Sequence, residues 1–185
     1  MKNSGFHPVE TFLMRLLWRN RLCGERGTNG AGRWARINKS GISDFYYYFD
    51  GTVGGNNFHY RVTEKDNRVL FAYRFMEFPD LKETQMAVDR DVLEQLNQLY
   101  LRYRLAAWNG FSKYHQHVCD GSAFSLQITF RDGAVLCADG RNVFPPRYHE
   151  FCAAMKALLD PLRDALLNAA KDQKRQKSGC RKITQ

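Results

Sequence analysis

The chain has 185 residues, of which 44% are hydrophobic and 14% aromatic, and its formal net charge at pH 7 is +9. This length suits one globular domain with some chain to spare, and the hydrophobic fraction is too high for a wholly disordered protein. No apolar stretch reaches the roughly 18 residues that a membrane-spanning helix needs, and no apolar run near the start is long enough for an export signal. The composition therefore predicts a soluble domain.

The positive charge is concentrated at the two ends of the chain. Residues 1–40 carry eight basic and two acidic side chains, and residues 171–185 carry six and one, whereas residues 41–170 have a net charge of −2. A domain that grips nucleic acid carries its basic charge on the folded body. Basic ends alone predict at most weak, salt-dependent contacts with nucleic acid, without sequence preference.

The five cysteines are irregularly spaced, and none of them forms a Cys-x-x-Cys pair; they are Cys23, Cys119, Cys137, Cys152 and Cys180. An odd number of scattered cysteines in a chain without an export signal is typical of a reducing compartment. We therefore expect free thiols, a cytoplasmic location and no disulfide framework.

Residues 1–41 are predicted to form an amphipathic helix, over about residues 8–22, and a glycine-rich linker. The apolar stripe of this helix consists of Val9, Phe12, Leu13, Leu16 and Leu17, and Arg15, Arg19 and Arg21 lie off it. A basic amphipathic helix can lie on a membrane or in a partner's groove, but docking on its own domain or fraying is favoured for a helix this short. The linker has no Lys-Ser/Thr ending, which argues against a phosphate-binding loop.

Residues 42–170 are predicted to be a single domain, in which the first half forms a hairpin-linked sheet. Aromatic and alternating apolar residues predict strands within 42–49, 58–63 and 69–75, with a tight turn at Asp66-Asn67. A helix with Asp89 as its N-cap is expected over about residues 89–106.

The second half of the domain is predicted to contain a loop, a hairpin and a long helix. After a loop over residues 111–122, apolar residues alternate from Phe124 to Phe130, and Asp132-Gly133 predicts a two-residue turn. That turn places Ile128 opposite Cys137, which puts Cys137 on the apolar face.

The last helix is expected to begin at Pro145-Pro146 and to kink or restart at Asp160-Pro161, and residues 171–185 are expected to be a disordered basic tail. The resulting order of three strands, a helix, two strands and a helix predicts an α+β fold. In this fold an antiparallel sheet of about five strands carries its helices on one face.

These motifs resemble those of a loose family of small uncharacterised bacterial α+β proteins, over about residues 42–165. The matching positions are Phe49, Gly51, Gly54-Gly55, Phe58, Tyr60 and Val62 in the first half, and Trp108, Gly110-Phe111, Asp120-Gly121, Phe124, Leu126, Ile128, Phe130, Asp132-Gly133, Gly140-Arg141-Asn142, Phe144-Pro145 and the helix start at Tyr148–Phe151 in the second. The resemblance implies a fold, and because the family has no established activity it implies no catalytic residue.

Histidines and cysteines near the second hairpin are candidate metal ligands. His115, His117 and Cys119 alternate along one segment, and His149 precedes Cys152 by three residues on the last helix. Imidazole and thiolate are the ligands that zinc prefers, so four such groups would suit a tetrahedral site if they converged. The spacing fits no established zinc signature, and solvated loop histidines with core cysteines are the favoured interpretation.

The same loop also holds the residue types of a thiol enzyme. Cys119 lies near His115, His117 and Asp120, and a cysteine activated by histidine is a nucleophile. Catalytic groups converge in space rather than along the chain, so this spacing is weak support for catalysis. Asp120-Gly121 is more simply a turn.

Aromatic residues are the remaining candidates for binding. Tyr46, Tyr48 and Trp108 would suit a surface that stacks on a peptide, a sugar or a base, although packing in the core or at its rim is favoured. The sequence therefore predicts a non-catalytic binding or interaction module without a cofactor, for an unknown protein or small-molecule ligand. The alternatives are weak nucleic-acid binding through the basic ends, and a thiol or metal-dependent enzyme built on residues 111–121.

Overall fold

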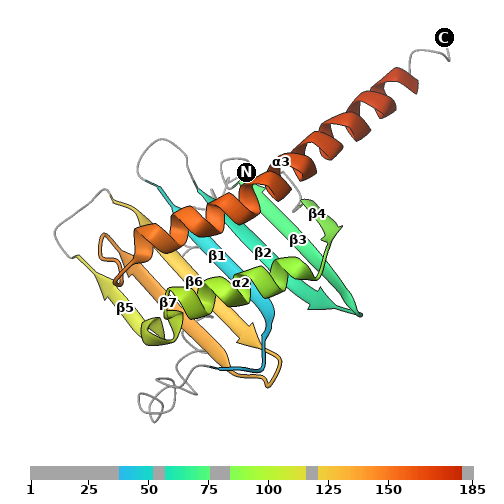
Figure 1. The fold of residues 1–185 in the computed structure, drawn as a ribbon. Helices are drawn as coiled ribbons and strands as arrows, with labels where there is room; N and C mark the ends of the chain where they lie inside the picture. Colours follow the sequence, from blue (N-terminus) through green and yellow to red (C-terminus); the bar gives the residue numbers. More distant parts are fainter. Residues whose placement is uncertain (1–37, 52–56, 76–83, 116–120, 181–185) are drawn as a thin grey trace, which may run out of the picture.

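The computed structural model describes residues 38–51, 57–75, 84–115 and 121–180, with side chains of the last helix described as far as Asp172. These residues form a seven-stranded sheet in the order β4-β3-β2-β1-β6-β7-β5. Two long helices cross the same face of this sheet (Figure 1). The predicted N-terminal helix and most of its linker lie outside the described residues.

Strands β1 to β4 form an antiparallel meander. Their bounds are Ile42–Asp50 for β1, Phe58–Lys65 for β2, Arg68–Phe75 for β3 and Thr84–Val88 for β4. The β2–β3 turn consists of Asp66 and Asn67, whose φ angles are +51° and +60°. Positive φ at both central residues is the requirement of a type I′ turn, so the predicted tight turn is confirmed.

The other three strands join the meander through β1. Strand β6 (Ala123–Phe130) pairs antiparallel with β1 and with β7 (Val135–Arg141). Strand β5 (Phe111–Tyr114) pairs parallel with β7 at the sheet edge. The central position of β1 thus links the two halves of the chain into one sheet.

The helices follow the predicted order. Helix α2 (Asp91–Arg102) contacts β1 and is followed by the short 3-10 helix η1 (Leu105–Trp108), and α3 (Tyr148–Cys180) crosses from β7 to β3 and β4 (Figure 1). The carboxylate of Asp89 accepts the backbone N–H of Asp91 at 3.1 Å. None of the described helices is both long and apolar enough to cross a membrane.

The core lies between the helices and the sheet, on what we call the apolar face. Alternate residues of β1 and β6 point into it, because successive side chains of a strand point to opposite faces. Its largest fully buried side chains are Tyr47, Tyr60, Phe45, Phe71, Phe130, Phe151, Ile42, Leu93, Leu96, Leu105, Leu126 and Ile128. The predicted burial of Phe124, Leu126, Ile128 and Phe130 is therefore confirmed.

The predicted number of strands was too low. About five were predicted, and β4 and β5 are the two that the pattern missed. Strand β4 has five residues and β5 has four, and both lie at the edges of the sheet. A short edge strand buries little and so leaves no clear alternation in the sequence. The predicted loop over residues 111–122 therefore begins with a strand.

The predicted register of the second hairpin, between β6 and β7, was wrong by one residue. Phe130 N–H donates to the Ala134 carbonyl at 2.8 Å, so the loop contains three residues, and Gly133 has a φ of +81°. This arrangement is typical of a turn followed by a glycine bulge, and it shifts the register by one residue. Ile128 therefore faces Leu136, and Cys137 faces Gln127 on the sheet face away from the helices.

Helix α3 differs from its prediction in two ways. It is continuous through Pro161 and extends to Cys180, so residues 171–180 are helical where a disordered tail was predicted. This segment contains mostly Lys, Gln, Arg and Asp, with its only glycine at position 179. Lysine, glutamine and arginine are strong helix formers, and a helix that packing has already nucleated propagates through them.

Candidate functional site

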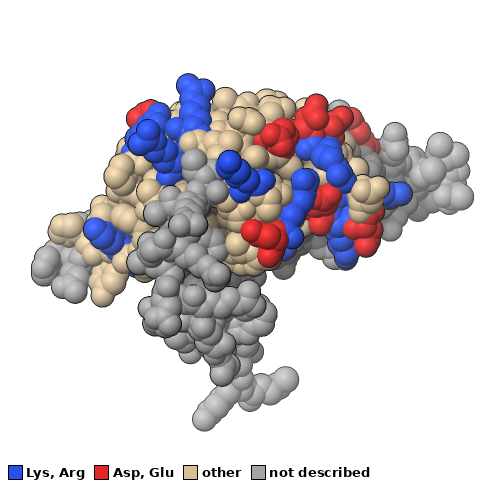
Figure 2. All heavy atoms as spheres, turned by 60° about the horizontal axis from the view of Figure 1, so that its bottom comes forward, with Lys and Arg blue, Asp and Glu red and all other residues tan. Residues whose placement is uncertain are grey.

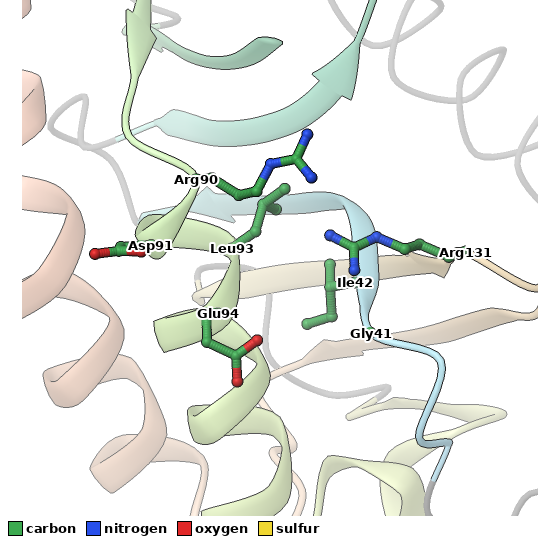
Figure 3. A pocket seen from close by; sticks show the side chains of 7 residues that line it. All are labelled: Gly41, Ile42, Arg90, Asp91, Leu93, Glu94 and Arg131. Carbon is green, nitrogen blue, oxygen red and sulfur yellow. The ribbon is translucent and has the colours of Figure 1, made fainter. Parts of the chain in front are cut away.

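A hollow of about 280 Å³ lies between the start of α2 and the β6–β7 hairpin. It is lined by Gly41, Ile42, Arg90, Asp91, Leu93, Glu94 and Arg131. The Arg90 and Arg131 side chains extend over Ile42 and Leu93, and Asp91 points away from this space (Figure 3). Two guanidinium groups thus border a small space with an apolar floor.

A single carboxylate holds both arginines in place. The two oxygens of Glu64, on β2, lie 2.8 Å from Arg90 Nη2 and 3.2 Å from Arg131 Nε. Arg90 Nη2 also donates to the side-chain oxygen of Asn67 at 2.9 Å. Because Arg131 uses only Nε toward Glu64, its two Nη groups retain four N–H donors with no partner among the described residues.

The backbone fixes where these side chains stand. Arg131 N–H donates to the Gly41 carbonyl at 3.0 Å, which ties the hairpin to the start of β1. Asn38 adds a second tie, since its amide donates to both carboxylate oxygens of Asp132 at 3.1 and 3.0 Å. These bonds lower the pKa of Asp132, mainly through the Ala134 backbone N–H and then through Asn38.

Sequence reasoning missed this site, because its charged residues come from three elements that the fold brings together. No spacing links Glu64, Arg90 and Arg131 along the chain. The one signal available is that Arg131 immediately precedes a turn and Arg90 immediately precedes a helix. Residues in such positions lie at the surface and beside connecting segments.

The predicted aromatic binding residues do not all come together. Tyr46 and Tyr48 lie side by side on the sheet face away from the helices, where the Tyr46 and His59 rings are 5.6 Å apart. Neither tyrosine is a free side chain. Trp108 is 2% exposed and packs edge-on against Phe151, with ring centroids 5.3 Å apart, so its ring is part of the core.

Of the predicted metal ligands, the structure describes two. His115 is exposed at the end of β5, and His149 is exposed on α3, where its ring contacts Phe144 and Tyr148. His117 and Cys119 lie outside the described residues, so the metal site and the thiol enzyme stay predictions. Within the described ranges, no three His, Cys, Asp or Glu side chains are grouped closely enough to hold a metal ion.

A buried polar cluster joins β1 to α3. The Tyr47 hydroxyl lies 2.7 Å from the Tyr148 hydroxyl and 3.3 Å from Cys152 Sγ. Burial raises the pKa of all three groups above their ordinary values. A thiol that stays protonated is a poor nucleophile, so this cluster is structural.

The Cys152 thiol is therefore expected to react slowly with iodoacetamide in the folded protein. A raised pKa lowers the thiolate fraction at pH 8, and burial limits access. Mass spectrometry should show alkylation of Cys152 at least severalfold slower in buffer than in 8 M urea, because unfolding exposes the thiol and removes the burial that raises its pKa. Equal rates in the two solvents would show that the cluster opens readily.

A second cluster holds the middle of α3 to the sheet. The Tyr60 hydroxyl donates to the Asp160 carboxylate, which also accepts Arg163 Nη1 at 2.9 Å. The guanidinium of Arg163 lies 6.0 Å from the ring centre of Tyr73 on β3. These contacts anchor the helix, and none of these residues lines the hollow beside Arg90 and Arg131.

Charges are mixed on the described surface that Figure 2 presents. Acidic and basic side chains are interleaved at one end of this view, and basic side chains stand apart at the other end. This agrees with the small negative net charge of residues 41–170. The described part of this face carries no continuous basic band.

The chain was also compared with known proteins. No family model matches the sequence, and no curated protein is similar to it. The functional argument therefore rests on the geometry of the site.

Proposed function

We propose that this protein is a non-catalytic binding module for a small ligand that carries an anionic group. The observation that carries the proposal is the pair of guanidinium groups, from Arg90 and Arg131, that one carboxylate holds beside an apolar floor. Arginine presents planar N–H donors that match carboxylate and phosphate oxygens. The floor of Ile42 and Leu93 suits an apolar portion of the same ligand.

The side chains around the hollow favour binding over catalysis. An arginine does not lose its proton in proteins, and Glu64 is engaged by both guanidinium groups. Among the described lining residues, Asp91 points away from the space between the arginines (Figure 3). Glu94 also lines the hollow, and its carboxylate accepts a hydrogen bond from Gln98 Nε2 at 3.0 Å. An anion would therefore be held by the N–H donors of the two arginines and not by a net positive charge of the lining.

The size of the hollow limits the ligand. A volume of about 280 Å³ is just below the roughly 300–1,000 Å³ of pockets that hold drug-sized molecules. We therefore expect a single aromatic ring or short aliphatic chain bearing one carboxylate or one phosphate. Benzoate and phenyl phosphate are suitable probes, because they share the ring and differ in the anionic group.

Arg131→Gln is expected to weaken binding of whichever probe binds the native protein by about tenfold, since a charge-assisted hydrogen bond contributes roughly 1.5–3 kcal/mol. NMR titration of the labelled full-length protein measures this change. The matched control is Arg61→Gln, because Arg61 is 50% exposed and pairs through Nε with one carboxylate, at 2.9 Å, as Arg131 does at 47% exposure.

The control variant is expected to bind the probe as the native protein does. Binding that Arg61→Gln and Arg131→Gln weaken equally would reflect general surface charge, and it would contradict the proposal. So would the absence of binding by both probes at millimolar concentrations. A preference between the two probes identifies the anionic group.

Nucleic-acid binding through the basic ends stays a prediction, and the described structure adds no support for it. The described chain begins at Asn38, beside the β6–β7 hairpin, and α3 carries its far end past β3 and β4 (Figure 1). The points at which the two basic segments join the body therefore lie on different sides. A single nucleic-acid track across the body would need them on the same side.

A further inference from the structure

The hollow beside Arg90 and Arg131 has a carboxylate in its wall as well as two guanidinium groups. Glu94 follows Arg90 by one turn of α2, and its backbone N–H donates to the Arg90 carbonyl at 3.5 Å. Residues four apart on a helix lie on the same side of it, so these two side chains border the same space. The Asp91 carboxylate, between them in the chain, points away (Figure 3).

Glu94 keeps hydrogen-bond acceptors that the described protein does not use. In the described part of the chain no ion pair joins Arg90 to Glu94, and arginine before glutamate is the less favourable order for such a pair on a helix. Arg90 Nη2 instead lies 2.8 Å from Glu64. Glu94 accepts one hydrogen bond, from Gln98 Nε2 at 3.0 Å, whereas a carboxylate has room for about four.

The positive and negative groups reach the hollow from different sides. In Figure 3 the Leu93 side chain lies between the Arg90 guanidinium and the Glu94 carboxylate. Arg131 comes from the hairpin and lies over Gly41, where a Cβ would approach Arg131 Nη1 to 3.2 Å, so the glycine leaves room for the guanidinium. The hollow therefore offers N–H donors on one side, a carboxylate on another and an apolar floor.

The balance of charge favours a ligand that carries both signs. The charges of the two arginines cancel those of Glu64 and Glu94. A ligand with only a negative charge would accept hydrogen bonds from the guanidinium groups but would be repelled by Glu94. In a zwitterion, an ammonium group would donate to Glu94 while the anionic group accepts from the arginines.

We propose that the ligand is an amino acid with an apolar side chain. Its carboxylate accepts from the Nη groups of Arg131, its ammonium group donates to Glu94, and its side chain lies on Ile42 and Leu93. A hollow of about 280 Å³ suits a molecule of this size. This inference rests on the proposed anion-binding function and deepens it, because it names the class of ligand.

Two pairs of compounds that differ only in the ammonium group test the inference. They are L-phenylalanine with 3-phenylpropanoate, and L-leucine with 4-methylpentanoate. NMR titration of the labelled full-length protein measures the four affinities. Reductant is left out of the buffer because Cys137 is disulfide-bonded, so the expectation that every cysteine is a free thiol was wrong.

The native protein is expected to bind at least one amino acid about two- to fivefold more tightly than its partner compound, the usual effect of an ion pair at an exposed position such as Glu94. Glu94→Gln should bring this ratio close to one, because glutamine keeps the size of the side chain and an oxygen for Gln98 but loses the charge. Asp91→Asn is the matched control. It removes a carboxylate from the same helix, one that points away from the arginines, and should leave the ratio unchanged (Figure 3).

The outcomes separate this inference from the proposal on which it rests. Equal affinities within each pair, or a preference for the amino acid that survives Glu94→Gln, would overturn the inference and leave anion binding intact. So would binding of benzoate or phenyl phosphate without binding of any of the four compounds. A ratio that Asp91→Asn lowers as much as Glu94→Gln would show a general effect of surface charge and would also overturn it. Binding that Arg131→Gln does not weaken would overturn the proposed function itself.

Discussion

Ile128→Asp is expected to unfold the protein or to lower its stability by several kcal/mol, because the new carboxylate would be buried without a partner. Ile128 is 0% exposed in the centre of β6, between Phe45 on β1 and Leu136 on β7. A domain of this kind is stable by only about 5–15 kcal/mol. The loss is therefore a large part of the total.

Gln127→Asp is the matched control, since it places the same side chain one residue away on the other face of the sheet. Gln127 is half-buried between Tyr46 and Cys137, and aspartate there should cost about 1 kcal/mol through its low strand propensity. Urea unfolding of both variants and the parent measures the difference. Similar midpoints for the two variants would show that the two faces of β6 are equally buried.

Phe151→Ala is expected to lower stability by about 3–5 kcal/mol, the usual cost of emptying a phenylalanine site in a core. The Phe151 ring is 0% exposed and packs edge-on against Trp108 and Tyr103, with centroid distances of 5.3 and 6.0 Å. Because it joins α3, η1 and the residue that ends α2, its loss loosens three elements together.

His149→Ala tests whether this effect is specific to the core. His149 lies two residues before Phe151 on α3 and is exposed, so its removal should change the free energy of unfolding by no more than about 0.5 kcal/mol. Thermal or urea unfolding serves for both variants. A loss below about 1 kcal/mol for Phe151→Ala would contradict the placement of α3 on the apolar face.

Local patterns in the sequence predicted those features of the fold that belong to a single strand, turn or helix. Alternation from Phe124 to Phe130 predicted which side chains of β6 are buried, and Asp66-Asn67 predicted the β2–β3 turn. Each of these patterns reports a side chain's direction relative to its own backbone, which local geometry fixes.

The register of the β6–β7 hairpin is a feature that such local patterns did not predict correctly. Asp132-Gly133 suits both a two-residue turn and a three-residue loop with a glycine bulge, and the two differ by one residue in register. The longer loop moves Cys137 from the apolar face to the sheet face away from the helices. The structure has the longer loop, in which Arg131 N–H donates to the Gly41 carbonyl just before β1.

The binding hollow depends wholly on tertiary structure. Glu64, Arg90 and Arg131 meet because the end of β2, the start of α2 and the β6–β7 hairpin lie close together. Trp108, predicted as a possible stacking surface, is buried because η1 packs beneath α3. The sequence by itself determined which residues prefer to be buried in each strand and helix, since that preference is a property of single side chains. Only the tertiary structure decided which polar groups meet, because that depends on strand order and on contacts between residues far apart in the chain.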